Sequence, residues 1–114
     1  MTTVIVYKNQ SVSYKGFTCI GHEEYRKKRL FHNEPDILCS AISTLVINTV
    51  NCLEELAGEK IKVNTLEETG FIKCDLPDDL QEKSVFLIDS MIYGLQNISK
   101  EYGEMYLLVK FEEV

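Results

Sequence analysis

The stretch "DILCSAISTLVINTVNCLEELAG", Asp36 to Gly58, is the clearest helical segment of the chain. Its apolar side chains recur at helical spacing, which predicts one buried face of an α-helix. The positions on this face are Leu38, Ala41, Ile42, Leu45, Val46, Thr49, Val50, Leu53 and Leu56. Pro35 disfavours helix in the residue before it, so Asp36 is the predicted N-cap, and Gly58 is the predicted stop.

This helix also raises the question of a membrane span, because Ile37 to Leu53 carries no charged residue. The segment is interrupted by serine, threonine and asparagine, and it is shorter than the roughly 20 apolar residues that a span needs. We interpret it as the core helix of a soluble domain, and we expect no membrane association.

Strands are predicted on both sides of the helix. Residues 3–7 and 12–20 are rich in β-branched and aromatic side chains and flank a polar turn, which predicts two paired strands. Ile61 to Asp75 is predicted as a hairpin closed near Gly70. Met105 to Phe111 is predicted as the last strand.

A second helix is predicted to open at Pro77 and Asp78 and to end at Gly103. Its buried stripe is predicted at Val85, Ile88, Ile92, Leu95 and Tyr102. The resulting order β-β-α-β-β-α-β predicts an α+β fold, a mostly antiparallel sheet of about five strands covered by two helices. With 114 residues, 45% of them hydrophobic, residues 1–114 are predicted to form a single domain.

The charge balance restricts the partners. Twelve basic against 18 acidic residues give a net charge of −6, so no direct nucleic-acid binding is expected and a basic partner is favoured. The acidic pairs Glu54-Glu55, Glu67-Glu68 and Asp78-Asp79 are interpreted as solvated faces. The basic run from Arg26 to Arg29 is interpreted as a soluble loop, with an RNA contact as the alternative.

The four cysteines form no C-x-x-C pair, which argues against a zinc site, and no metal or organic cofactor is expected. The N-terminus lacks the features of a secretory signal, so we expect a cytoplasmic protein with free thiols. Cys39 is predicted at the third helical position, where the helix dipole favours a reactive thiolate. Cys19, Cys52 and Cys74 are predicted in strands or mid-helix, buried and inert.

Only two histidines, His22 and His32, can serve Cys39 as a base. His22 is favoured because it follows Gly21 at a strand end, where a rigid scaffold holds side chains in place. Ser43 lies one helical turn after Cys39 and can hydrogen-bond a substrate. Asp36 can orient the imidazole, although capping competes for its carboxylate. By spacing alone, this segment fits a loop entering a core helix as well as a catalytic dyad.

A longer pattern contains these residues: Gly21-His22, then Tyr25, then Asp36-Ile37-Leu38-Cys39-Ser40-Ala41-Ile42-Ser43. It resembles the bacterial ribosomal-processing cysteine proteases, the Prp family. The resemblance implies a cysteine endopeptidase that trims the N-terminal extension of large-ribosomal-subunit protein twenty-seven, and it implies a homodimer. It also implies that Cys39 is the nucleophile and His22 the base, with Asp36 and Ser43 near the site.

The implied mechanism has His22 accepting the Cys39 proton, thiolate attack on the scissile carbonyl, and hydrolysis of the acyl-enzyme. Helix-start amides, that of Cys39 included, are the expected oxyanion donors. One departure is a loop about five residues longer than usual between His22 and Cys39, with Glu34-Pro35 in place of a glycine. It keeps His32 open as an alternative base. It also motivates a rival, a non-catalytic dimeric module that binds ribosomal protein or an assembly factor; a thiol hydrolase of small esters is a third possibility.

Overall fold

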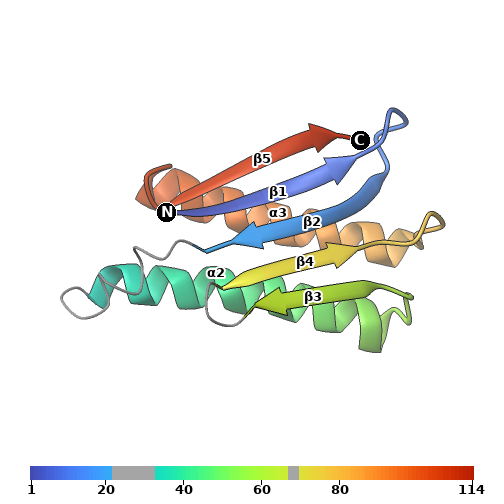
Figure 1. Cartoon of the computed structure of the whole chain (residues 1–114), viewed down its shortest axis with the longest axis horizontal. Coiled ribbons are helices and arrows are strands. Elements are labelled where there is room, and N and C mark those ends of the chain that lie inside the picture. The colour runs from blue at the N-terminus through green and yellow to red at the C-terminus, as the bar shows by residue number, and fades with distance from the viewer. Residues whose placement is uncertain (22–32, 67–69) are drawn as a thin grey trace.

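The structure is a computed structural model, and it describes residues 1–21, 33–66 and 70–114, with the backbone alone at 33–36. In this part of the chain, five strands and two helices follow the predicted order (Figure 1). The elements are β1 (Thr2–Lys8), β2 (Tyr14–Ile20), α2 (Asn33–Asn51) continued by the π-helical η1 (Cys52–Leu56), β3 (Lys62–Leu66), β4 (Phe71–Asp75), α3 (Glu82–Tyr102) and β5 (Leu107–Glu113).

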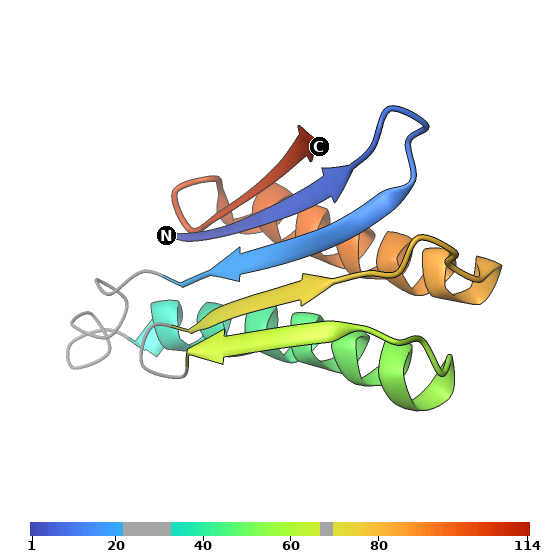
Figure 2. The ribbon, with the colours of Figure 1, turned by 45° about the vertical axis from the view of Figure 1, so that its right-hand side comes forward.

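The strands form one mixed sheet in the order β3-β4-β2-β1-β5. The pairs β1/β2, β2/β4 and β3/β4 are antiparallel, and β1/β5 is parallel. The predicted α+β class and the mostly antiparallel sheet are therefore confirmed. Figure 2 shows that the ends of β2 and β3 and the start of β4 lie at the same end of the sheet as the first turns of α2.

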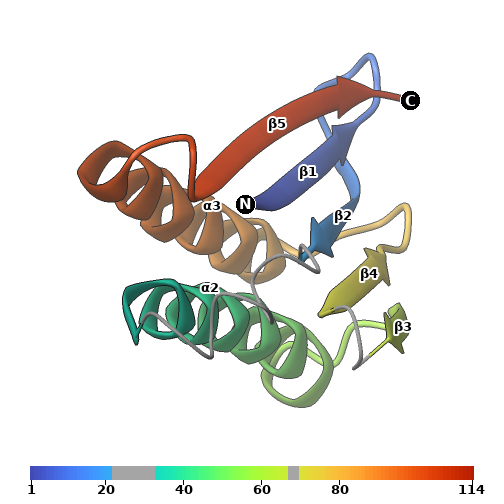
Figure 3. The ribbon, with the colours of Figure 1, turned by 60° about the vertical axis from the view of Figure 1, so that its left-hand side comes forward.

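Both helices cover the same face of the sheet (Figure 3). Strand alternation sends every second side chain toward them, and burial of these apolar side chains builds one core. Its strand residues include Val4, Val6, Phe17, Cys19, Ile72, Cys74 and Leu107, and its helix residues include Ile42, Val46, Leu53, Ile88, Met91 and Leu95.

The start of α2 differs from the prediction. The helix begins at Asn33, so Asp36 lies inside it and is not the N-cap, and Cys39 lies in the second turn rather than at the third position. The reason is that proline is tolerated in a first helical turn, where its missing N–H has no acceptor to lose. Pro35 therefore sits within the helix instead of preceding it.

The other end of α2 widens into the π-helix η1, where the Ala57 N–H donates to the Cys52 carbonyl at 2.9 Å. The predicted burial of Leu56 is wrong, since its side chain is 74% exposed. A π-turn holds more residues than an α-turn, which rotates Leu56 off the buried face. Gly58 ends the segment with φ +68°, as predicted.

In the described part of the chain, Ile37–Leu56 is the one helix that is long and apolar enough to be a candidate membrane span. Core helices of soluble proteins also meet this criterion of length and composition. Its residues Leu38, Ile42, Val46 and Val50 are buried, and α2 packs against α3. This is the arrangement of a core helix.

The second helix, α3, begins at Glu82, five residues after Pro77, so its predicted start is wrong. The Glu59 carboxylate accepts hydrogen bonds from the Gln81 N–H at 3.0 Å and from the Ser84 hydroxyl, and it thereby fixes the first turn. The buried stripe is Ser84, Ile88, Met91, Ile92 and Leu95. Tyr102, predicted in this stripe, is exposed because the helix passes beyond the sheet core there.

Two strand boundaries also shift. β2 begins at Tyr14 rather than residue 12, because Val12 adopts φ +62° in the turn and donates its N–H to the Asn9 carbonyl at 2.9 Å. β5 begins at Leu107, and the exposed Met105 precedes it. The hairpin of β3 and β4 is as predicted, with Gly70 at φ +70° beside β4.

Candidate functional site

Cys39 lies in the second turn of α2. The first turns of this helix lie at the same end of the sheet as the last residues of β2, the strand that leads to Gly21 (Figure 2). Cys19, near the end of β2, is 2% exposed, and burial raises the pKa of its thiol to about 12.

The four thiols are free and differ in accessibility. Cys19 and Cys74 are buried, and burial raises the pKa of both to about 12, so they are protonated and inert at neutral pH, as predicted. Cys39 is partly exposed. Cys52 was predicted to be buried and is also partly exposed. Cys39 is thus the accessible thiol at the β2 end of α2, and Cys52 lies at the other end.

Gly21 follows β2 at this same end of the sheet. A Cβ built on Gly70 would lie 3.8 Å from the Gly21 Cα, so the two glycine backbones approach closely. The positive φ of Gly70 favours glycine there. The β2/β4 ladder, which pairs Cys19 with Ile72, holds the end of β2 against the start of β4.

The remaining predicted site residues divide into two groups. Ser43 lies on α2, one turn after Cys39, and is partly exposed. Asp36 lies in the first turns of α2. The two candidate bases, His22 and His32, lie outside the described residues, together with Tyr25 and the basic run at 26–29.

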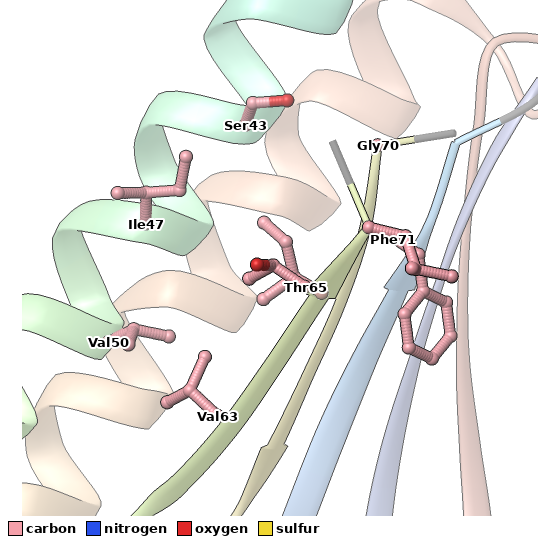
Figure 4. Close-up of a pocket in the computed structure, with 9 residues that line it drawn as sticks. Ser43, Ile47, Val50, Val63, Thr65, Gly70 and Phe71 are labelled. Atoms are coloured by element: carbon pink, nitrogen blue, oxygen red, sulfur yellow. The ribbon is translucent and has the colours of Figure 1, made fainter. Parts of the chain in front are cut away.

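A groove that the sequence reasoning missed begins at Ser43. It encloses about 300 Å³ between α2 and the β3–β4 hairpin. Figure 4 shows Ser43, Ile47 and Val50 in a row along α2, opposite Val63 and Thr65 of β3. The spacing of the three helix residues, four and then three, is a sequence signal for one face, but that β3 lies above this face is not readable from local sequence. The lining is mainly apolar, so the groove suits apolar side chains rather than a charged ligand.

Within the described ranges, no three His, Cys, Asp or Glu side chains are close enough to share a metal ion. The chemistry that this end of the molecule offers is that of an accessible thiol, a hydroxyl one turn away and an adjacent apolar groove. An accessible thiol can serve as a nucleophile when a base activates it, and an apolar groove can take up apolar side chains.

Comparison with known proteins gives a family and several relatives. A family model described as cysteine protease Prp matches residues 1–107. A protein of Bacillus subtilis (strain 168) named ribosomal processing cysteine protease Prp is 24% identical over 108 residues, which are 91% of this chain and 92% of that protein. A Staphylococcus aureus protein of the same name is 26% identical over 69 residues, 60% of this chain and 65% of the relative.

Solved structures share the fold. A crystal structure described as an essential ribosomal processing protease Prp from S. aureus with a substrate peptide has a TM-score of 0.84 and 20% identity, covering 98% of this chain and 100% of that one. A second crystal structure, described as the same S. aureus protease with a covalently linked product peptide, has a TM-score of 0.80, 20% identity and the same coverage. A Streptococcus mutans protein has a TM-score of 0.83 and 24% identity, covering 100% of this chain and 96% of the other.

Proposed function

Because the chain belongs to the cysteine protease Prp family, and is therefore a cysteine-type peptidase, we propose that it removes the N-terminal extension of large-ribosomal-subunit protein twenty-seven. The observation that carries the proposal is the accessible Cys39 thiol at the β2 end of α2 and the apolar groove. The acidic chain also favours a basic ribosomal substrate. A cytoplasmic location belongs to the same proposal, since ribosome assembly takes place there.

In the proposed mechanism, His22 accepts the proton of Cys39, and the thiolate attacks the scissile carbonyl. The imidazolium of His22 gives its proton to the amine product as it leaves. Water then hydrolyses the thioester, which releases the carboxylic acid and regenerates the thiol. No metal or organic cofactor takes part in these steps.

The earlier start of α2 changes two parts of this mechanism. The dipole effect is confined to the first turn of a helix, so activation of Cys39 in the second turn falls to the base, His22. Only the first four helical N–H groups lack an intrahelical acceptor. The Cys39 N–H comes after these four, so the prediction that it is an oxyanion donor is wrong.

The earlier start also affects the supporting residues. The capping role that competed for the Asp36 carboxylate is gone, and we assign Asp36 to orienting His22. Ser43, at the rim of the groove, is assigned to hydrogen bonding with the substrate backbone. Gly21 is assigned to positioning His22, because it directly follows the end of β2, which is fixed by pairing with β4.

A homodimer is part of the proposal, and the face of the sheet opposite the helices supports it. No described helix covers this face (Figure 3). By alternation with the buried Val4 and Cys19, it carries the side chains of Ile5, Tyr7 and Ile20.

We expect Ile20→Glu to shift sedimentation at micromolar concentration from dimer to monomer. Phe86→Glu, a change at an exposed aromatic residue of α3, is the matched control. A wild-type monomer would contradict the homodimer.

Incubation with the full-length precursor of protein twenty-seven from the same organism tests the function. We expect mass spectrometry to show a precursor shortened at its N-terminus. An intact precursor that co-purifies with the protein would instead identify a binding module. Turnover of small esters with an intact precursor would identify a thiol hydrolase.

A further inference from the structure

The outer edge of β3 is open in the described part of the chain. β3 is an edge strand, paired with β4 alone, and all five of its residues are exposed. Edge strands present backbone N–H and C=O groups that can pair with another extended chain. The pairing of β3 with β4 determines which β3 residues direct these backbone groups to the open edge.

The Leu76 N–H donates to the Lys15 carbonyl at 3.1 Å, so Leu76 directs its backbone groups toward β2. Along an antiparallel strand, successive residues direct their backbone groups to opposite edges. The backbone groups of Cys74 and Ile72 therefore also point toward β2, and those of Phe71, Lys73 and Asp75 point toward β3. The partners of that second set on β3 are Lys62, Asn64 and Leu66. Val63 and Thr65 consequently direct their N–H and C=O groups to the open edge.

The same two residues line the groove. Their side chains lie opposite Ile47 and Val50 of α2 (Figure 4). Residues that face each other across a ladder point their side chains to the same side of the sheet. A strand paired with Val63 and Thr65 would therefore place two alternate side chains into the groove.

We propose that an extended segment of the peptide substrate docks as an additional strand on the β3 edge, with alternate apolar side chains in the groove. This inference rests on the proposed function and names how its substrate is held. The occupant is a substrate peptide because the groove is continuous with the site: it begins at Ser43, one turn from Cys39. Ile47 and Val63 are 46% and 37% exposed, so apolar surface is available to be covered.

Residue-resolved amide exchange in the inactive Cys39→Ala variant tests the docking. The probe is a synthetic peptide with the sequence of the precursor extension. We expect exchange at Val63 and Thr65 to slow by about tenfold or more when the peptide is present, because their N–H groups gain acceptors. Exchange at Lys62 and Asn64 should not change, since these amides already face β4. Unchanged exchange at Val63 and Thr65 would overturn the inference.

A pair of substitutions gives a kinetic test. Ile47→Glu places a charge in the groove, and we expect the KM for the peptide to rise by about tenfold or more, in keeping with the loss of one buried apolar contact. Leu56→Glu makes the same change at an exposed position on η1, outside the groove, and should leave KM unchanged. Equal KM values for the two variants would contradict the docking model.

Two further outcomes separate this inference from the proposed function. Cleavage of the peptide by the wild type with no effect at β3 would overturn the docking and leave the function standing. Protection at β3 with an intact precursor would overturn the function and support the docking. Protection that depends on protein concentration in the absence of peptide would assign the edge to a second copy of the chain, against the inference.

Discussion

Glu59, in the segment after η1, accepts a hydrogen bond from the hydroxyl of Ser84 at the start of α3, 25 residues further along the chain. Both side chains are buried, at 8% and 0% exposed. The same carboxylate accepts the Gln81 N–H, and the Gln81 side-chain amide donates to the Ala57 carbonyl at 2.7 Å. Glu59 thus caps α3 and fixes it to the end of the first helix.

Glu59→Gln should lower the free energy of unfolding by about 1–3 kcal/mol at neutral pH, because it replaces the charged acceptor of two hydrogen bonds with a neutral amide. Urea denaturation at pH 7 measures the loss. Glu55→Gln, at an exposed position, is the control and should change little. Equal stability of the two variants would show that the cap contributes nothing.

The same cap predicts a pH dependence. Hydrogen bonds from Ser84 and the Gln81 backbone hold the pKa of Glu59 below its ordinary value of 4.5. A carboxylate with a lowered folded-state pKa contributes its full stability above the unfolded pKa and loses it as the pH falls through the folded one. The difference between wild type and Glu59→Gln should therefore shrink as the pH is lowered below about 4.5. A difference that is constant between pH 7 and pH 3 would contradict this assignment.

Val12 is the one described non-glycine residue with positive φ, at +62°, and it is 68% exposed. A β-branched side chain in this conformation is strained by about 1–2 kcal/mol. Val12→Gly should raise the free energy of unfolding by about 1 kcal/mol, after the greater flexibility of unfolded glycine is subtracted. Val12→Ala keeps the Cβ atom and should recover less. Thermal denaturation of both variants checks the order, and a destabilised Val12→Gly would refute it.

Alkylation distinguishes the four thiols. At neutral pH we expect iodoacetamide to modify Cys39 first, because the proposed base His22 would activate it, and Cys52 more slowly, because no base is proposed for that thiol. Cys19 and Cys74 should react only after unfolding, since burial raises their pKa to about 12. Peptide mapping by mass spectrometry gives the order. Labelling of Cys52 before Cys39 would remove the case for an activated Cys39.

The main elements were predictable because their signals are local. Helical spacing from Leu38 to Leu53 identified α2, and alternation with a closing Gly70 identified the β3–β4 hairpin. The helix starts were not predictable in the same way. Proline is tolerated just before a helix and in its first turn, so Pro35 does not determine where α2 begins. The cap of α3 comes from Glu59, which is distant in sequence.

The candidate site was predictable in part for a similar reason. Cys39 and Ser43 share a helix face, so their relation follows from spacing. The groove depends on β3 packing over Ile47 and Val50, which is a tertiary contact that no local pattern encodes. The π-turn that rotates Leu56 off the buried face also has no clear sequence signal.

The most direct test of the central claim compares two cysteine variants on the precursor of protein twenty-seven. Cys39→Ala removes the proposed nucleophile, and Cys52→Ala removes the other partly exposed thiol of the same helix. Mass spectrometry of the precursor after incubation should show N-terminal shortening with wild type and Cys52→Ala, and an intact precursor with Cys39→Ala. Normal cleavage by Cys39→Ala would contradict the account.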